Sequence, residues 1–278
     1  MQVKHKIIVM SGKGGVGKSQ TTVSLAAAFL REGKKVGILD VDLCGPSIPH
    51  LVGLNKKDVH QGSNGWIPVY KDKDQKLAVM VCFLLSWFYK VPKKKINIFS
   101  CIKSIGFLLA DENQAVIMRG PKKISVIRQF LNNVDWGELD VLLIDTPPGT
   151  SDEHIIVAEE LTKQKFDGAI IVTTPQNVSI GDVRRQITFC KRVGIQVLGL
   201  VENMSGFVCP HCSECSLIFS SGGGEQLAKE QNVPYLGSVP IDPNLSEAAE
   251  KGQILDHPPT ESIKTISQFV SNFVKHNK

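Results

Sequence analysis

Near its amino end the sequence reads Gly12-Lys13-Gly14-Gly15-Val16-Gly17-Lys18-Ser19, which matches the pattern G-x-x-x-x-G-K-[ST] without a gap. The apolar run 7–10 precedes this stretch, and a helix-like segment, 21–32, follows it. A phosphate-binding loop (P-loop) requires this order, because backbone N–H groups turn toward the phosphate and the helix adds its positive amino end. The alternative is a glycine-rich turn that binds nothing, and the flanking strand and helix argue against it.

Three side chains of this loop have predicted roles in nucleotide chemistry. We expect Lys18 to neutralise the β- and γ-phosphates and the Ser19 hydroxyl to complete a magnesium shell. Lys13 follows the first glycine and lies too far back to reach its own γ-phosphate easily, but it could reach one held by a facing subunit. It would then act as a charge clamp across a dimer. The alternative is a solvated loop lysine.

The composition suits one large α/β domain over residues 1–278, or one domain with an insertion: 42 % of the 278 residues are hydrophobic. No apolar run approaches the ~20 residues needed to span a bilayer. Residues 1–6 lead directly into the first predicted strand, which leaves no room for a signal or transit peptide. Seven cysteines, an odd number, favour a reducing compartment and metal chemistry over disulfides. We therefore expect a cytoplasmic protein.

Two predicted buried strands end in an acid. Residues 36–40 are apolar until Asp40, with Asp42 two residues later, and residues 141–145 end at Asp145. Ligands gather at the carboxyl ends of strands in open α/β sheets, so these acids are expected to face the nucleotide, with Asp145 on the magnesium side. Further strands, with helices between them, are predicted at 76–80, 169–174, 197–202 and 235–239. The sequence therefore predicts a doubly wound, mostly parallel sheet with helices on both faces.

The carboxyl-terminal stretch has an amphipathic pattern. Apolar residues recur at helical spacing on one face: Ile263, Ile266, Phe269, Val270, Phe273 and Val274. We favour a last helix packed on the sheet over a membrane-surface helix, because the polar face lacks a dense basic stripe.

A cysteine motif, Cys209-Pro210-His211-Cys212-Ser213-Glu214-Cys215, follows the strand predicted at 197–202. A closed zinc or iron–sulfur site needs four soft ligands, and this segment is too cramped for all of its ligands to converge easily. Two protomers could each supply Cys209 and Cys212 to one site across a dimer axis, the same dimer that Lys13 favours. The alternatives are half of a zinc ribbon and buried, unreactive thiols. Four cysteines without partners at metal spacing are interpreted as packing residues: Cys44, Cys82, Cys101 and Cys190.

Assembled in this way, the chain resembles the Mrp/NUBP family of P-loop ATPases, the scaffold proteins of cytosolic iron–sulfur cluster assembly. The matching stretches are SGKGGVGKS at 11–19, DVDLCGPS at 40–47, DTPPGTSDEH at 145–154, ENMSGF at 202–207 leading into CPHC at 209–212, and FSSGGGE at 219–225. They span nearly the whole chain. Longer family members begin with an extra cysteine-rich segment that is lacking here, so the chain resembles the short type.

The resemblance implies a role for the catalytic residues. Lys13 would be the signature lysine of a deviant Walker A motif and would act across the dimer. Lys18 would be catalytic within its own loop. Asp42 would orient the attacking water, and Asp145 would support magnesium through water.

The resemblance also implies binding roles nearer the carboxyl end. Asn203 would contact the adenine, with Pro240 lining the base pocket. Cys209 and Cys212 would hold a [4Fe–4S] cluster that bridges two subunits.

The implied activity is that of an ATP hydrolase, slow and partner-dependent, which uses ATP and Mg²⁺. It would assemble a [4Fe–4S] cluster and transfer it to cytosolic and nuclear apo-proteins, as a homodimer and in a heteromer with a longer homologue. No nucleic acid or membrane is expected as a partner. The rival functions are a positioning ATPase that binds membranes or DNA, which the Cys209/Cys212 pair disfavours, and a nucleotide-switched zinc protein.

One departure from the family pattern lies at residues 81–103, where the family runs from the equivalent of Met80 directly to Ser104. The lysines of this stretch number five, with no acid, and so account for the whole net charge of +5. With its aromatic residues, the stretch could be a membrane- or partner-binding finger. We favour a retained intron, because valine codons begin with GT, one lysine codon ends with AG, and the reading frame is kept.

Overall fold

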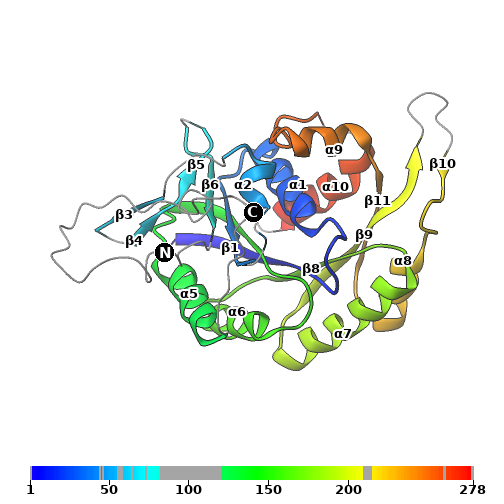
Figure 1. Cartoon of the computed structure of the whole chain (residues 1–278), viewed down its shortest axis with the longest axis horizontal. Coiled ribbons are helices and arrows are strands. Elements are labelled where there is room, and N and C mark those ends of the chain that lie inside the picture. The colour runs from blue at the N-terminus through cyan, green and yellow to red at the C-terminus, as the bar shows by residue number, and fades with distance from the viewer. Residues whose placement is uncertain are drawn as a thin grey trace.

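The computed structural model of the chain describes residues 2–43, 45, 47–54, 59–63, 65–72, 74–81, 120–208, 215–258 and 261–276. Within these residues a nine-stranded sheet lies between two layers of helices (Figure 1). The insertion predicted at 81–103 lies outside the described residues, apart from Val81.

The sheet has the strand order β10-β9-β8-β1-β7-β2-β6-β5, and β11 also pairs with β9. All of its pairings are parallel except those of β10 with β9 and of β5 with β6. The strands are β1 (Gln2–Ser11), β2 (Val36–Asp40), β5 (Val69–Tyr70), β6 (Leu77–Val81), β7 (Glu138–Asp145), β8 (Gly168–Thr173), β9 (Val197–Val208), β10 (Cys215–Ser216) and β11 (Tyr235–Ile241). A separate two-stranded ribbon consists of β3 (His60–Gly62) and β4 (Gly65–Ile67). Strands that alternate with helices along the chain give this parallel order.

The helices divide between the two faces of the sheet (Figure 1). One face is covered by α5 (Gly120–Asn133), α6 (Asp152–Thr162), α7 (Asn177–Val193) and α8 (Gly223–Gln231). The other is covered by α1 (Lys18–Arg31), α2 (Ile48–Leu51), α9 (Pro243–Glu250) and α10 (Glu261–His276).

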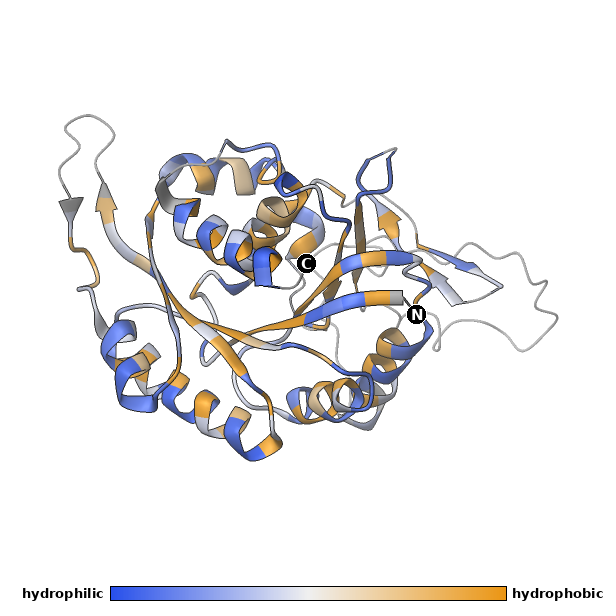
Figure 2. Cartoon of the chain, turned by 180° about the vertical axis from the view of Figure 1, so that it is seen from behind, coloured by the Kyte–Doolittle hydropathy of each residue, from blue (hydrophilic) through white to orange (hydrophobic). Residues whose placement is uncertain are grey.

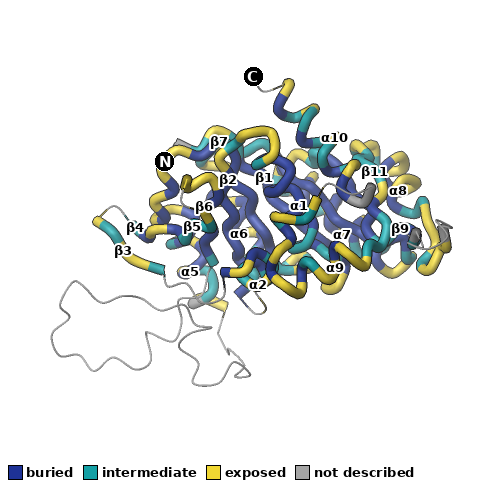
Figure 3. Tube along the Cα trace, turned by 90° about the horizontal axis from the view of Figure 1, so that it is seen from above, coloured by how far each residue is buried: buried dark blue, intermediate teal, exposed yellow. Residues whose placement is uncertain are grey.

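Alternating strand residues supply both halves of the core. In β1, Ile8 and Met10 face the α5–α8 layer, whereas Ile7 and Val9 face the α1–α10 layer. A strand buried on both faces therefore reads as a continuous apolar run. Figure 2 shows these hydrophobic segments along the central strands, and Figure 3 shows the same strands buried between helices whose outer sides are exposed.

The predicted α/β fold, doubly wound with helices on both faces, is confirmed. Two predicted strands are longer than expected: β9 continues to Val208, beyond the predicted end at residue 202, and β1 begins at Gln2 rather than at residue 7. The last helix packs as expected, because α10 buries Ile263, Ile266 and Val270 in the core. No helix among the described residues is long and apolar enough to cross a membrane.

Candidate functional site

The P-loop joins β1 to α1 and is shaped by its glycines. Gly15 and Gly17 have φ angles of 78° and 81°, in the left-handed region that other residues rarely adopt. A Cβ on Gly12 would lie 2.6 Å from the backbone of Asp182 in α7, so the loop rests directly on that helix. Since Lys18 begins α1, the positive amino end of the helix lies behind the loop. The loop thus has the form of a phosphate cradle.

Asp145, at the carboxyl end of β7, holds three side chains of α1. Its Oδ2 accepts hydrogen bonds from Lys18 Nζ at 2.6 Å and from Ser19 Oγ at 2.7 Å. Its Oδ1 accepts one from Thr22 Oγ1 at 2.7 Å. The carboxylate is fully buried, where an ionised group needs such partners. The structure therefore brings together Lys18, Ser19 and Asp145, as the sequence led us to expect.

Thr22 is a site residue that sequence reasoning missed. It lies four residues after Lys18 and so on the same face of α1. Its hydroxyl also lies 3.1 Å from the Lys18 carbonyl, but it carries one proton, and the shorter contact is with Asp145. The spacing was the available signal. It did not assign the role, because many helical threonines bond only to the preceding turn.

Asp40 lies beside Asp145, since the two residues are paired in the parallel register of β2 and β7. Burial, followed by the neighbouring Asp145 carboxylate, raises the pKa of Asp40 well above its usual range, while Lys18 opposes the shift. Asp40 also accepts the backbone N–H groups of Asp42 at 2.9 Å and Ile48 at 3.5 Å. It therefore shapes the turn on which Asp42 lies.

Lys13 and Asp42 lie at the same edge of the sheet. Lys13 is exposed in the P-loop, and Asp42 is half-buried just after β2. Their predicted roles concern a second subunit and a bound nucleotide, and they stay predictions.

The loop after β7 is held to the P-loop strand. Thr146 donates its hydroxyl to the Val9 carbonyl at 2.9 Å, and the Gly149 N–H donates to the Ser11 carbonyl at 2.8 Å. The loop ends in a capping box, in which the Ser151 N–H donates to His154 Nδ1 at 3.2 Å. Burial lowers the pKa of His154 to about 4, so the ring is neutral at pH 7.

Asn203 lies on β9 and contacts the P-loop from the side. Its Nδ2 donates to the Val16 carbonyl at 2.9 Å, and a Cβ on Gly17 would collide with its amide. In β11, Val239 is paired with Asn203 and is followed by the half-buried Pro240. The structure therefore places Asn203 and Pro240 near each other, while their contact with adenine stays a prediction.

The predicted metal ligands Cys209 and Cys212 lie outside the described residues. The two strands that flank them pair in antiparallel fashion, with Phe207 opposite Ser216. This β9–β10 hairpin projects from one end of the sheet (Figure 1). Within the described part of the chain, no three His, Cys, Asp or Glu side chains gather to hold a metal ion. Burial raises the pKa of Cys190 to about 12, and its side chain lies in the core as expected.

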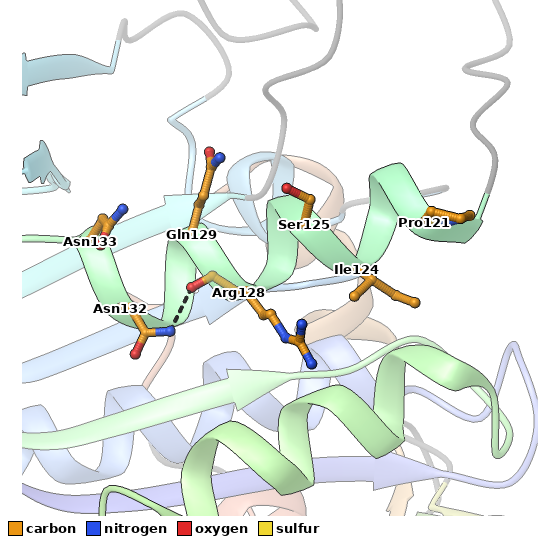
Figure 4. Close-up of a pocket in the computed structure, with 7 residues that line it drawn as sticks. All are labelled: Pro121, Ile124, Ser125, Arg128, Gln129, Asn132 and Asn133. Carbon is orange, nitrogen blue, oxygen red and sulfur yellow. Dashed lines mark hydrogen bonds between the residues drawn. The ribbon is translucent and has the colours of Figure 1, made fainter.

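A shallow depression of about 370 Å³ lies along α5, away from these residues (Figure 4). It is lined by Pro121, Ile124, Ser125, Arg128, Gln129, Asn132 and Asn133. Arg128 contacts Glu159 at 3.4 Å and Glu160 at 3.3 Å in α6. All of its polar lining groups come from α5, and none lies at the edge of the sheet that carries the P-loop. We therefore do not propose this depression as the nucleotide site.

Comparisons with known proteins agree with this geometry. Residues 2–95 and 89–274 match the ParA family profile described as "NUBPL iron-transfer P-loop NTPase". The cytosolic Fe-S cluster assembly factor nubp2 of Danio rerio is 56 % identical over 273 residues, which are 98 % of this chain and 93 % of that protein. A protein of Dictyostelium discoideum, named cytosolic Fe-S cluster assembly factor NUBP2 homolog, is 52 % identical over 274 residues, 98 % of this chain and 95 % of that protein.

Solved structures show the same fold. The nucleotide-binding protein of Archaeoglobus fulgidus, in complex with ADP and with cobalt found by PIXE, has a TM-score of 0.73 at 38 % identity and covers 92 % of this chain and 90 % of its own. The septum site-determining protein MinD of Pyrococcus horikoshii, complexed with Mg-ADP, has a TM-score of 0.66 at 19 % identity and covers 99 % of both chains; at this identity the likeness concerns the fold alone. The chain belongs to the ParA/NUBPL family of nucleotide-binding P-loop NTPases, the Mrp/NUBP group that its motifs resemble.

Proposed function

We propose that this chain is an ATP-dependent factor that assembles a [4Fe–4S] cluster and transfers it to cytosolic and nuclear apo-proteins. Relatives named cytosolic Fe-S cluster assembly factors align with nearly the whole chain. The observation that carries the proposal is the course of β9. Its Asn203 contacts the P-loop, and the same strand ends at Val208, directly before Cys209.

The residues of the P-loop edge fit a magnesium nucleotide. A backbone N–H cradle, a lysine, a hydroxyl and a carboxylate are the groups that P-loop enzymes use for it, and the related Archaeoglobus protein is described with ADP. Magnesium, when bound, neutralises charge on the phosphates. Lys18 and Ser19 would exchange Asp145 for the phosphates and the metal, while Thr22 keeps Asp145 in place. Asp42 would orient the attacking water, and Lys13 of a second subunit would stabilise the charge that develops.

The cluster is the cargo of this reaction. Cys209 and Cys212 from each of two subunits would supply its four thiolates. Because each subunit holds only half of the ligands, subunit movement would release the cluster. The proposed assemblies are a homodimer and a heteromer with a longer homologue, in the cytosol.

The rival positioning ATPase has less support. The fold likeness to MinD carries no function at 19 % identity. A membrane-surface helix needs an unpartnered apolar face, whereas α10 buries Ile263, Ile266 and Val270 against the sheet.

Anaerobic reconstitution with iron and sulfide tests the proposal. The double variant Cys209→Ala, Cys212→Ala should lose bound iron, sulfide and the brown absorbance. The matched control is Cys190→Ala, which removes a core thiol with a pKa of about 12 and should keep the cluster. Unchanged iron and sulfide in the double variant would refute the scaffold role. A colourless wild-type protein with stoichiometric zinc would favour the zinc protein instead.

A further inference from the structure

Glu202 is a buried acid that the nucleotide mechanism above does not use. It lies on β9, between Thr173 of β8 and Ser238 of β11, and its side chain is fully buried. A buried carboxylate is costly unless its lone pairs are satisfied, so its partners indicate what it holds in place.

Glu202 accepts hydrogen bonds from three donors that follow it in the sequence. Oε1 accepts from Ser205 Oγ at 2.6 Å and from the Gly222 N–H at 2.9 Å, and Oε2 accepts from the Gly224 N–H at 2.5 Å. Gly222 is the N-cap of α8, so the carboxylate occupies the positive amino end of that helix. A Cβ on Gly224 would lie 3.0 Å from Oε2, so a side chain there would crowd the carboxylate.

Glu202 also influences the pKa of Tyr235. Burial, and then the charge of Glu202, raise the pKa of Tyr235 to about 12. The hydrogen bonds of Glu202 to Gly222 and Gly224 tie β9 to the amino end of α8.

The next residue faces the opposite side of the sheet. Side chains alternate along a strand, so Glu202 points to the layer of α8 and Asn203 to the layer of α1, where Asn203 bonds to the Val16 carbonyl. Beyond them, Met204 and Gly206 have φ angles of 58° and 85°, which interrupt the regular strand before the β9–β10 hairpin. The dipeptide Glu202-Asn203 is thus the point at which the P-loop, the amino end of α8 and the base of the hairpin are joined.

We propose that Glu202 is a positioning residue that couples the nucleotide site to α8 and the β9–β10 hairpin. By fixing β9 against Gly222 and Gly224, it holds the Asn203 amide in place against the P-loop. A shift of the Val16 carbonyl on phosphate binding then passes through β9 to these two amides. The inference requires nucleotide binding but not a cluster, and so goes beyond the proposed function.

Amide hydrogen exchange of the full chain, with and without Mg²⁺ and ADP, tests the coupling. In the wild-type protein, ADP should change the exchange rates of the Gly222 and Gly224 amides. In Glu202→Gln the amide group cannot accept both backbone N–H groups, so this response should disappear and the ADP dissociation constant should rise about fivefold or more.

Two further variants keep the test decisive. Glu225→Gln removes a charge from the first turn of the same helix, where Glu225 is exposed and pairs with Lys229 at 2.7 Å, and it should leave both readouts unchanged. Ser205→Ala keeps the carboxylate and both backbone donors, and it should weaken the response in the same direction; it decides the matter if Glu202→Gln does not fold.

The proposal is wrong if the Gly222 and Gly224 amides of the wild-type protein do not respond to ADP. It is also wrong if Glu202→Gln, or Ser205→Ala where Glu202→Gln does not fold, keeps both the exchange response and the ADP affinity of the wild type. Neither readout uses iron. A failed coupling would therefore leave cluster assembly standing, and a failed cluster reconstitution would leave the coupling standing.

Discussion

Asp145 and Glu202 are both fully buried acids on parallel strands of one sheet, yet they hold different kinds of partner. Two of the donors on Asp145 are the side chains of Lys18 and Ser19, which a nucleotide and its metal would attract away. Two of the donors on Glu202 are backbone N–H groups at the amino end of α8, which are fixed in place by the helix backbone. Asp145 is therefore suited to an exchange of partners, and Glu202 to a fixed joint.

Removal of Lys18, one of the exchangeable donors on Asp145, should have the largest effect on hydrolysis and stability. We expect Lys18→Ala to lower the ATP hydrolysis rate by about 10²- to 10³-fold, because the phosphate charge loses its cation. The buried Asp145 would also lose an ion pair, so the free energy of unfolding should fall by about 3 kcal/mol. Steady-state kinetics and urea unfolding measure the two effects. Lys13→Ala is the control: it removes an exposed lysine of the same loop and should lower hydrolysis without a change in stability.

Thr22→Val should have the next largest effect on hydrolysis, because it leaves Asp145 Oδ1 without its donor. We expect kcat to fall about tenfold with a smaller change in KM, since Thr22 positions Asp145 rather than binding nucleotide. Thr22→Ser keeps the hydroxyl and should restore most of kcat. Equal activity of the valine and serine variants would show that Asp145 is positioned without Thr22.

Acidification should lower the stability of the protein through His154, at the end of the loop that follows Asp145. The unfolded chain protonates His154 near pH 6.5, whereas the folded chain does so only near pH 4. The free energy of unfolding should therefore fall as the pH drops through this window, by about 3 kcal/mol in total from this residue, with no contribution above pH 7.5. His154→Gln should remove that part of the slope, while His276→Gln, at an exposed position, should retain it. An identical slope in both variants would contradict the assignment.

The smallest effect is expected from residues 81–103. Among the described residues, the donors on Asp145 come from α1, and those on Glu202 come from β9 and the amino end of α8. A chain that joins Met80 to Ser104 should therefore bind ADP as the full chain does. Peptide mapping of the native protein should recover the peptide across that junction, and abundant peptides from within 81–103 would refute the retained intron.

The sequence by itself determined the fold class and the core of the site. Three local patterns were sufficient: apolar runs that end in Asp40 and Asp145, helical segments between them, and the complete P-loop motif. Such patterns predict which residues are buried and the order of strand, loop and helix. Lys18, Ser19 and Asp145 followed from the same order, since parallel strands bring their carboxyl ends to one edge of the sheet.

Only the tertiary structure decided which donors each buried acid holds. Thr22 reaches Asp145, Asn203 reaches the Val16 carbonyl, and Glu202 reaches Gly222 and Gly224 because of strand register and helix placement. The bonds of Thr22 and Asn203 join residues more than a hundred positions apart, and no local period encodes them. The sequence predicted a loop that binds phosphate, and the structure showed the strand, β9, that links this loop to the amino end of α8.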